Sequence, residues 1–118
     1  MAQAPAELSV ITRMYDLAVW TCRHVARFDR GHRFTLGERL ERQANRVLEG
    51  LLRARYDSRG RADLVRQVNV ELELLRFQFR LAKDLRCLSL DGYGYSARVV
   101  NEVGQMVGGW LKKSGPPA

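Results

Sequence analysis

The sequence predicts an all-α protein, an up-down-up-down antiparallel four-helix bundle. Prolines occur only at Pro5, Pro116 and Pro117, so none interrupts a helix in the interior of the 118-residue chain. Apolar residues in that interior recur every three or four positions, as on one face of a helix, and strand-type alternation is missing. Short breaks in the pattern place consecutive helices antiparallel. A chain of this length is expected to form one domain over residues 1–118.

The first helix is expected over residues 7–28. Its apolar positions fall on one stripe that should face the core: Val10, Met14, Leu17, Ala18, Thr21, Val25 and Phe28. A linker follows over residues 29–33, with Gly31 as a turn residue.

The second helix is expected over residues 36–55. Thr35 and Glu38 form a capping-box pattern, in which the Thr35 side chain caps the helix and Glu38 reaches back to the Thr35 amide. The residues expected to face inward are Leu36, Leu40, Ala44, Val47, Leu48 and Leu51.

The segment 57–60 breaks the pattern, and a third helix is expected over residues 62–88. Ser89 is a suitable N-cap for a fourth helix over residues 90–112, which leaves a frayed tail at 113–118.

Glycines and a tryptophan mark the inner side of the fourth helix. Gly104 and Gly108 lie four residues apart there, and each costs helix stability, which predicts close approach of a neighbouring helix. Trp110 falls at the apolar edge, where core packing is the main interpretation and base stacking the alternative.

The third helix has two apolar stripes. One is expected to face the core and comprises Leu64, Val65, Val68, Leu72, Leu75, Phe79 and Ala82. The other lies about 140° away around the helix axis and comprises Val70, Leu74, Phe77, Leu81, Leu85 and Leu88. Left in water, the second stripe would exceed the apolar patches that monomers usually carry. It predicts either a subunit interface, formed by Val70, Leu74, Phe77, Leu81 and Leu85, or a central helix covered on two sides by its own neighbours.

The formal net charge is +7, and seventeen of the twenty basic residues are arginine. This balance suits a polyanionic partner, because guanidinium groups form paired hydrogen bonds to phosphates. The alternative is that many of these arginines are merely solvated.

Candidate binding residues follow from helical spacing. The second helix carries Arg39, Arg42, Arg46 and Arg53, the third carries Arg76, Arg80 and Lys83, and the first carries Arg23 and Arg27. Such rows can follow a phosphate backbone. Equally open is pairing within the second helix, Glu38 with Arg42 and Glu49 with Arg53.

Cys22 and Cys87 are too few for a disulfide framework and are expected to be buried, reduced thiols. With no long apolar run and no signal peptide, a soluble, cytoplasmic protein without membrane contact is expected.

No enzyme motif stands out, and neither a metal site nor a cofactor is expected. His24 and His32 are the only histidines, too few for a bundle-type metal centre. The spacing of Arg27 and His32 resembles the Arg-x4-6-His motif of HEPN-type ribonucleases, which is kept as an alternative.

Three strings resemble the accessory variability determinant (Avd) family of diversity-generating retroelements. They are RFTLGER at residues 33–39, LRFQFRLAKDL at 75–85 and EVGQMVGGWL at 102–111, in the order of the family, and the resemblance spans about residues 14–113. It implies a four-helix bundle that assembles into a homopentamer and binds the retroelement's reverse transcriptase, its template-repeat RNA and DNA, without catalysis. Arg76 and Arg80 match arginines of the family's second string and are therefore ranked first.

The bundle proteins encoded in intervening sequences of 23S ribosomal RNA genes are a rival family of similar architecture, with an unassigned RNA- or protein-binding role. Their Asn-Ile-Ala-Glu-Gly string is missing, since residues 43–50 read QANRVLEG, and this favours Avd.

Overall fold

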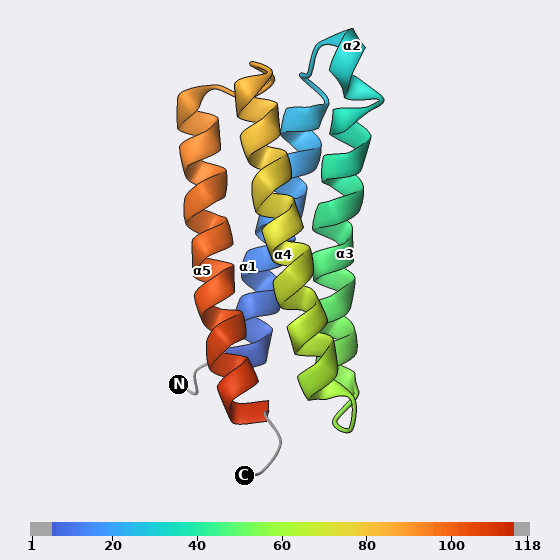
Figure 1. The fold of residues 1–118 in the computed structure, drawn as a ribbon, viewed down its shortest axis with the longest axis vertical. Helices are drawn as coiled ribbons and strands as arrows, with labels where there is room; N and C mark the ends of the chain where they lie inside the picture. Colours follow the sequence, from blue (N-terminus) through green and yellow to red (C-terminus); the bar gives the residue numbers. More distant parts are fainter. Residues whose placement is uncertain (1–5, 115–118) are drawn as a thin grey trace.

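The computed structural model describes residues 6–114, which form four long helices and one short one. The long helices are α1 (Ala6–Val25), α3 (Leu36–Tyr56), α4 (Arg61–Asp84) and α5 (Leu90–Ser114), and the short one is α2 (Arg30–Arg33). The long helices run alternately up and down (Figure 1). Both α1 and α4 pack against α3 and α5, so α1 and α4 occupy opposite corners of the bundle. The predicted all-helical, four-helix architecture is confirmed.

The core lies where the inward stripes of the four helices meet. On α1 every residue predicted to face inward is buried except Ala18, and on α3 every one except Leu48. On α4 only Leu64 of the predicted core stripe is partly exposed. Phe79 is the largest of the fully buried side chains. Helical periodicity therefore located the core almost residue by residue.

The first helix ends earlier than predicted. The amides of Arg27 and Phe28 donate to carbonyls three residues back, at 2.9 and 3.0 Å, so the chain tightens into a turn after Val25. Phe28 is still buried, which shows why its apolar spacing suggested a longer helix. The linker also differs from the prediction, because its residues form α2 and place His32 in a helical turn.

The capping-box prediction at Thr35 is wrong. No side-chain hydrogen bond caps α3, and the Thr35 hydroxyl instead donates to the Gly31 carbonyl at 3.4 Å. Because the helical turn of α2 places the Gly31 carbonyl within reach of the Thr35 hydroxyl, this hydroxyl bonds to Gly31 and does not cap α3. At the start of α5 the prediction is confirmed: the Gly92 amide donates to Ser89 Oγ at 3.0 Å.

The end of α4 comes four residues before the predicted one, at Asp84. Arg86 has φ 63°, the Cys87 amide donates to the Ala82 carbonyl at 2.8 Å, and the Arg86 amide donates to Lys83 at 2.9 Å. This is the Schellman arrangement, in which the left-handed position is usually glycine. The turn redirects the chain, so Leu88 is buried instead of continuing the second apolar stripe.

Replacing Arg86 by glycine should stabilise the protein by about 1 kcal/mol, because a side chain in the left-handed region is strained and glycine is not. Urea unfolding measures the change. Arg80→Gly is the matched control: it removes the same charge from the interior of α4 and should lower the free energy of unfolding by about 1 kcal/mol. Equal losses at both positions would contradict the expected strain.

Close helix approach occurs at a different glycine from those predicted. A Cβ on Gly104 would meet Leu72 Cδ2 at an ordinary 3.6 Å, and one on Gly108 would meet nothing within 4 Å. A Cβ on Gly50 would lie 2.6 Å from Val68 Cγ2. Among the helical glycines, those that need a missing side chain thus lie on α3 rather than α5: Gly50 against α4, and Gly37, where a Cβ would lie 2.7 Å from Val25 Cγ1 at the end of α1.

Two further predictions concern Trp110 and membrane spans. Trp110 is buried, as predicted for a core residue, and the Arg61 guanidinium lies 5.9 Å from its ring centroid.

None of the helices in residues 6–114 combines the length and the hydropathy that crossing a bilayer requires.

Candidate nucleic-acid interface

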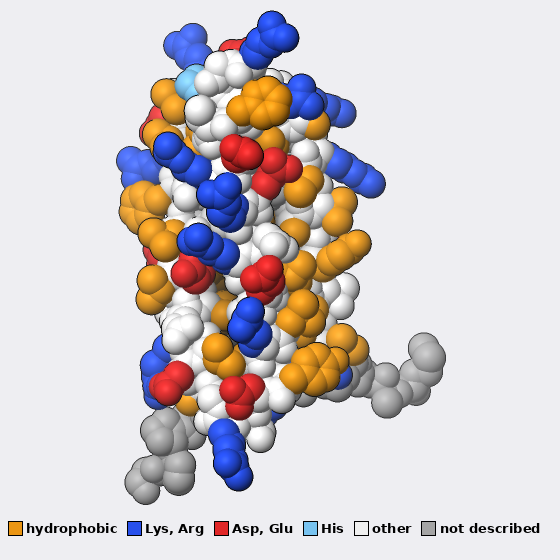
Figure 2. Space-filling view, turned by 90° about the vertical axis from the view of Figure 1, so that its right-hand side faces the viewer, with side chains coloured by type: hydrophobic (Ala, Val, Ile, Leu, Met, Phe, Trp, Pro, Cys, Tyr) orange, Lys and Arg blue, Asp and Glu red, His pale blue; other side chains and the backbone are white. Residues whose placement is uncertain are grey.

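The α3 arginines form a row on the side of the helix that borders α4. Arg39, Arg42 and Arg46 are exposed and line a hollow together with Gln43 and Gln78. Steps of three, four and seven residues keep the row on one side of α3, which is why spacing alone predicted it. Figure 2 shows blue side chains following one another along this face, with acidic side chains between them.

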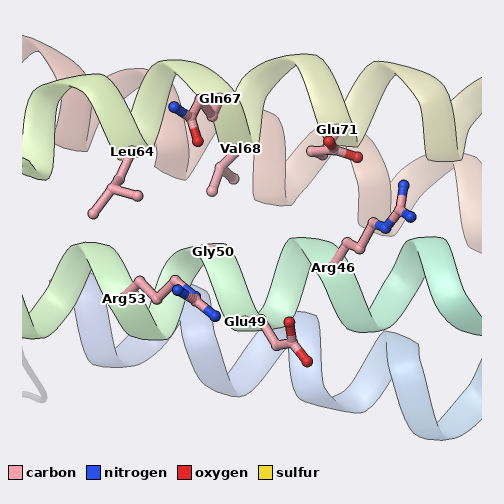
Figure 3. Close-up of a pocket in the computed structure, with 8 residues that line it drawn as sticks. All are labelled: Arg46, Glu49, Gly50, Arg53, Leu64, Gln67, Val68 and Glu71. Carbon is pink, nitrogen blue, oxygen red and sulfur yellow. The ribbon is translucent and has the colours of Figure 1, made fainter.

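A second hollow, of about 290 Å³, continues the row along the α3–α4 boundary. Arg46 and Arg53 line it from α3, and Gln67 and Glu71 line it from α4. Figure 3 shows the Arg46 side chain reaching from α3 toward α4. Arg46 lines both hollows, so the two lie next to each other along the row.

The predicted pairs within α3 do not form. The ion pairs found in residues 6–114 involve Arg13, Arg66, Arg76 and Lys83, and none includes an arginine of the α3 row. Glu49, expected to pair with Arg53, instead accepts a hydrogen bond from Asn45 at 3.0 Å. The row keeps its guanidinium groups available for an anionic ligand.

Gln43, which was not among the predicted site residues, lines the first hollow and joins α3 to α4. It is 4% exposed, and its Nε2 donates to the backbone carbonyl of Glu71 at 2.8 Å and to the carboxylate of the same residue at 2.5 Å. The bond occupies one carboxylate oxygen of Glu71, which lines the second hollow. A polar residue inside an apolar stripe was the available signal.

The three basic residues predicted on α4 have different surroundings. Arg76 donates from Nε to Glu73 at 3.0 Å and from Nη1 to the Asn101 side chain, so it joins α4 to α5. Lys83 pairs with Asp84 at 3.4 Å and lies 4.7 Å from the centroid of the Tyr93 ring. Arg80 is exposed and belongs to none of the ion pairs in the described part of the chain.

Arg23 and Arg27 lie away from the α3 row. Both are exposed and line a cleft between α1 and α5, the edge of the bundle opposite the α3–α4 edge. Arg23 lies on α1, whereas Arg27 lies in the turn that follows it. Within one chain these two arginines cannot extend the α3 row.

The second apolar stripe of α4 is exposed. The exposed fractions of its five predicted interface residues run from 43% to 61%: Val70, Leu74, Phe77, Leu81 and Leu85. The alternative of a central helix covered by its own neighbours is therefore wrong. The stripe runs from Val70 to the end of α4, a larger apolar surface than scattered exposed leucines produce.

A further apolar surface lies on the α1–α3 side. Phe34, 66% exposed, shares a hollow with Cys22 and Ala26, and Leu52 lies farther along α3 on the side of Glu41. Figure 2 shows apolar side chains on both flanks of the basic face. Because α1 and α4 are at opposite corners, the chain presents two unlike apolar surfaces that face different ways.

The two residues considered for catalysis lie in different turns of the chain. Arg27 lies in the turn after α1 and His32 lies in α2, with no hydrogen bond between them in the described region.

Both cysteines are free, but Cys22 is exposed and Cys87 half-buried, so the prediction of buried thiols is wrong for Cys22. Loss of hydration, then the Glu41 carboxylate, raises the pKa of Cys22, which keeps the thiol neutral.

A comparison with protein-family models gives a match over residues 8–114 to a family described as bAvd-like. No curated protein was found to match the chain.

Proposed function

The chain belongs to the bAvd-like family, and from this membership we propose that it is a non-catalytic accessory protein of a diversity-generating retroelement. It binds the element's reverse transcriptase and nucleic acid, namely template-repeat RNA and DNA, through basic surfaces, and so supports mutagenic cDNA synthesis in the cytoplasm. The observation that carries the proposal is the row of exposed α3 arginines without ion pairs.

The length of the row suits a phosphate backbone. From Arg39 to Arg53 the helix rises about 21 Å, the length of about six base steps. Each phosphate contact releases counterions and makes affinity depend on salt. No aromatic side chain lines the hollows beside the row, so recognition there is of backbone and shape rather than of base sequence. Arg80 adds an exposed cation on α4.

The exposed stripe of α4 forms the contact between subunits in this proposal. A ring arises when a surface on one copy meets a different surface on the next, and α4 and the α1–α3 side supply two such surfaces. Five copies are proposed because the Avd family, which the chain resembles, forms pentamers. The ring repeats each basic row five times, which strengthens binding to a long polyanion.

Replacing three arginines of the row together tests the nucleic-acid surface. The triple variant Arg39→Gln, Arg42→Gln and Arg46→Gln should bind RNA more weakly, and the slope of log affinity against log salt should fall by about two to three units. Fluorescence anisotropy with labelled RNA at several salt concentrations measures both quantities. Arg66→Gln is the control, because Arg66 already pairs with Asp63 at 2.9 Å.

An unchanged salt slope in the triple variant would remove the α3 row from the proposal. Co-purification with the reverse transcriptase is measured on the same proteins. If RNA affinity falls while co-purification persists, the row contacts RNA and the polymerase binds elsewhere. If only co-purification fails, the row is the polymerase contact.

A further inference from the structure

A cleft between α1 and α5 brings together aromatic rings and cations that lie far apart in the sequence. Its volume is about 550 Å³, within the range of sites that hold small ligands. Trp20, His24 and Arg23 line it from α1, Arg27 from the following turn, and Tyr95 from α5. The cleft lies on the edge of the bundle opposite the α3 row.

The rings form an ordered stack. The centroids of Trp20 and His24 are 3.8 Å apart with the planes inclined by 25°, and Tyr95 lies 5.0 Å from Trp20 at 35°. Phe79 packs against Trp20 in an edge-to-face arrangement, with the ring centroids 6.1 Å apart. The bond between His24 Nδ1 and the Trp20 carbonyl, 2.9 Å long, fixes the imidazole against the indole. The stack is therefore held rigid by its own contacts.

This stack is only partly covered. Trp20, His24 and Tyr95 are each half-buried, so part of every ring faces the cleft. By contrast Trp110, the other tryptophan of the chain, is buried at the far end of α5. Rings that only packed in the core would be buried, as Trp110 is.

The charge around the stack is positive. Arg23 and Arg27 are exposed and belong to none of the ion pairs in residues 6–114, and Asp16 is the one acid among the residues that line the cleft. The nearby Arg13 is neutralised by Glu102, with Nε 2.5 Å from the carboxylate. Two cations against one acid leave a net attraction for a phosphate.

We propose that this cleft binds an unpaired nucleotide of a single-stranded nucleic acid. The base stacks on the rings of the cleft, and Arg23 and Arg27 contact the flanking phosphates. Aromatic stacking beside a basic surface is how proteins hold single strands without reading their sequence. The inference rests on the proposed nucleic-acid function and adds a class of ligand to it, because the α3 row contacts only phosphates.

Fluorescence of Trp20 tests the stacking directly. Trp110→Phe leaves Trp20 as the only tryptophan, so quenching reports on the cleft alone. An oligouridylate of about 12 nucleotides, whose bases are unstacked, should quench the emission on binding. An RNA duplex of the same length should bind through phosphates without quenching, because its bases are already stacked.

A matched pair of tyrosines on α5 tests the side chains. Tyr95→Leu should weaken oligouridylate binding by about 5- to 150-fold and leave duplex binding unchanged. Tyr93→Leu is the control, since Tyr93 is also half-buried but lies beneath Lys83, away from the cleft. Arg23→Gln with Arg27→Gln should weaken single-strand binding and lower its salt slope.

The outcomes separate this inference from the function it rests on. If oligouridylate and duplex bind alike, without quenching and without an effect of Tyr95→Leu, the cleft is not a nucleotide site, while nucleic-acid binding stands. If neither oligomer binds, the proposed nucleic-acid function fails as well. Quenching by oligouridylate that Tyr95→Leu abolishes and Tyr93→Leu preserves is the result expected.

Discussion

A chain that carries both Leu74→Glu and Leu81→Glu should be a folded monomer of 13.5 kDa, whereas the unsubstituted chain should assemble into a species of about 68 kDa. Both leucines belong to the exposed stripe of α4, at 48% and 43% exposure, so the subunit itself has room for the new carboxylates. Burying unpaired charges in an apolar interface costs several kcal/mol per contact, which is enough to dissociate a ring.

Light scattering coupled to size-exclusion chromatography measures the mass, and circular dichroism confirms that the helices remain. The control Asn69→Glu with Gln105→Glu adds the same two charges at exposed polar positions on α4 and α5, and should leave the assembly intact. A monomeric unsubstituted chain at micromolar concentration would remove the proposed ring. An oligomer that survives both glutamates would move the subunit contact away from α4.

Phe79→Ala should lower the free energy of unfolding by about 3–5 kcal/mol, which approaches the whole stability of a small domain. Phe79 is 1% exposed and its removal leaves a cavity beside Trp20 in the middle of the bundle. Phe77, two residues earlier, is 60% exposed on the opposite face, and Phe77→Ala should change the stability of the monomer by less than about 0.5 kcal/mol.

Urea unfolding of both variants in the Leu74→Glu, Leu81→Glu background makes the comparison clean, because assembly no longer adds to stability there. In the otherwise unsubstituted chain the two substitutions should have different effects. Phe77→Ala weakens the ring, whereas Phe79→Ala unfolds the subunit. Similar losses of stability from both substitutions would show that the two faces of α4 are not distinct.

Periodicity predicted the helices and the core because burial imposes the same spacing on any packed helix. It failed where backbone geometry decides the outcome. Leu85 and Leu88 continue an apolar pattern, but the left-handed conformation at Arg86 ends α4 and turns Leu88 inward. Nothing in an arginine signals that conformation, which glycine usually supplies. The cap at Thr35 failed similarly, since it depended on the shape of the preceding turn.

Of the candidate sites, those on a single helix could be predicted from the sequence, and those formed between helices could not. The α3 row could be predicted because Arg39, Arg42 and Arg46 lie on one helix, where spacing fixes direction. Contacts between helices could not be. Arg76 reaches Asn101 across 25 residues, which ties it to α5, and Trp20 meets Tyr95 across a still longer separation. The grouping of aromatic and basic residues cannot be found in the sequence, because it exists only after folding.

An even number of long helices brings the start of α1 and the end of α5 to the same end of the bundle, while the connections after α1 and after α4 lie at the other (Figure 1). Cyclic symmetry keeps that direction in every copy, so the proposed pentamer has two unlike rims. Labels joined to either terminus would crowd onto one rim and leave its counterpart bare. A polymerase that binds the labelled rim would therefore be blocked by the labels, whereas a polymerase that binds the other rim would not be affected by them.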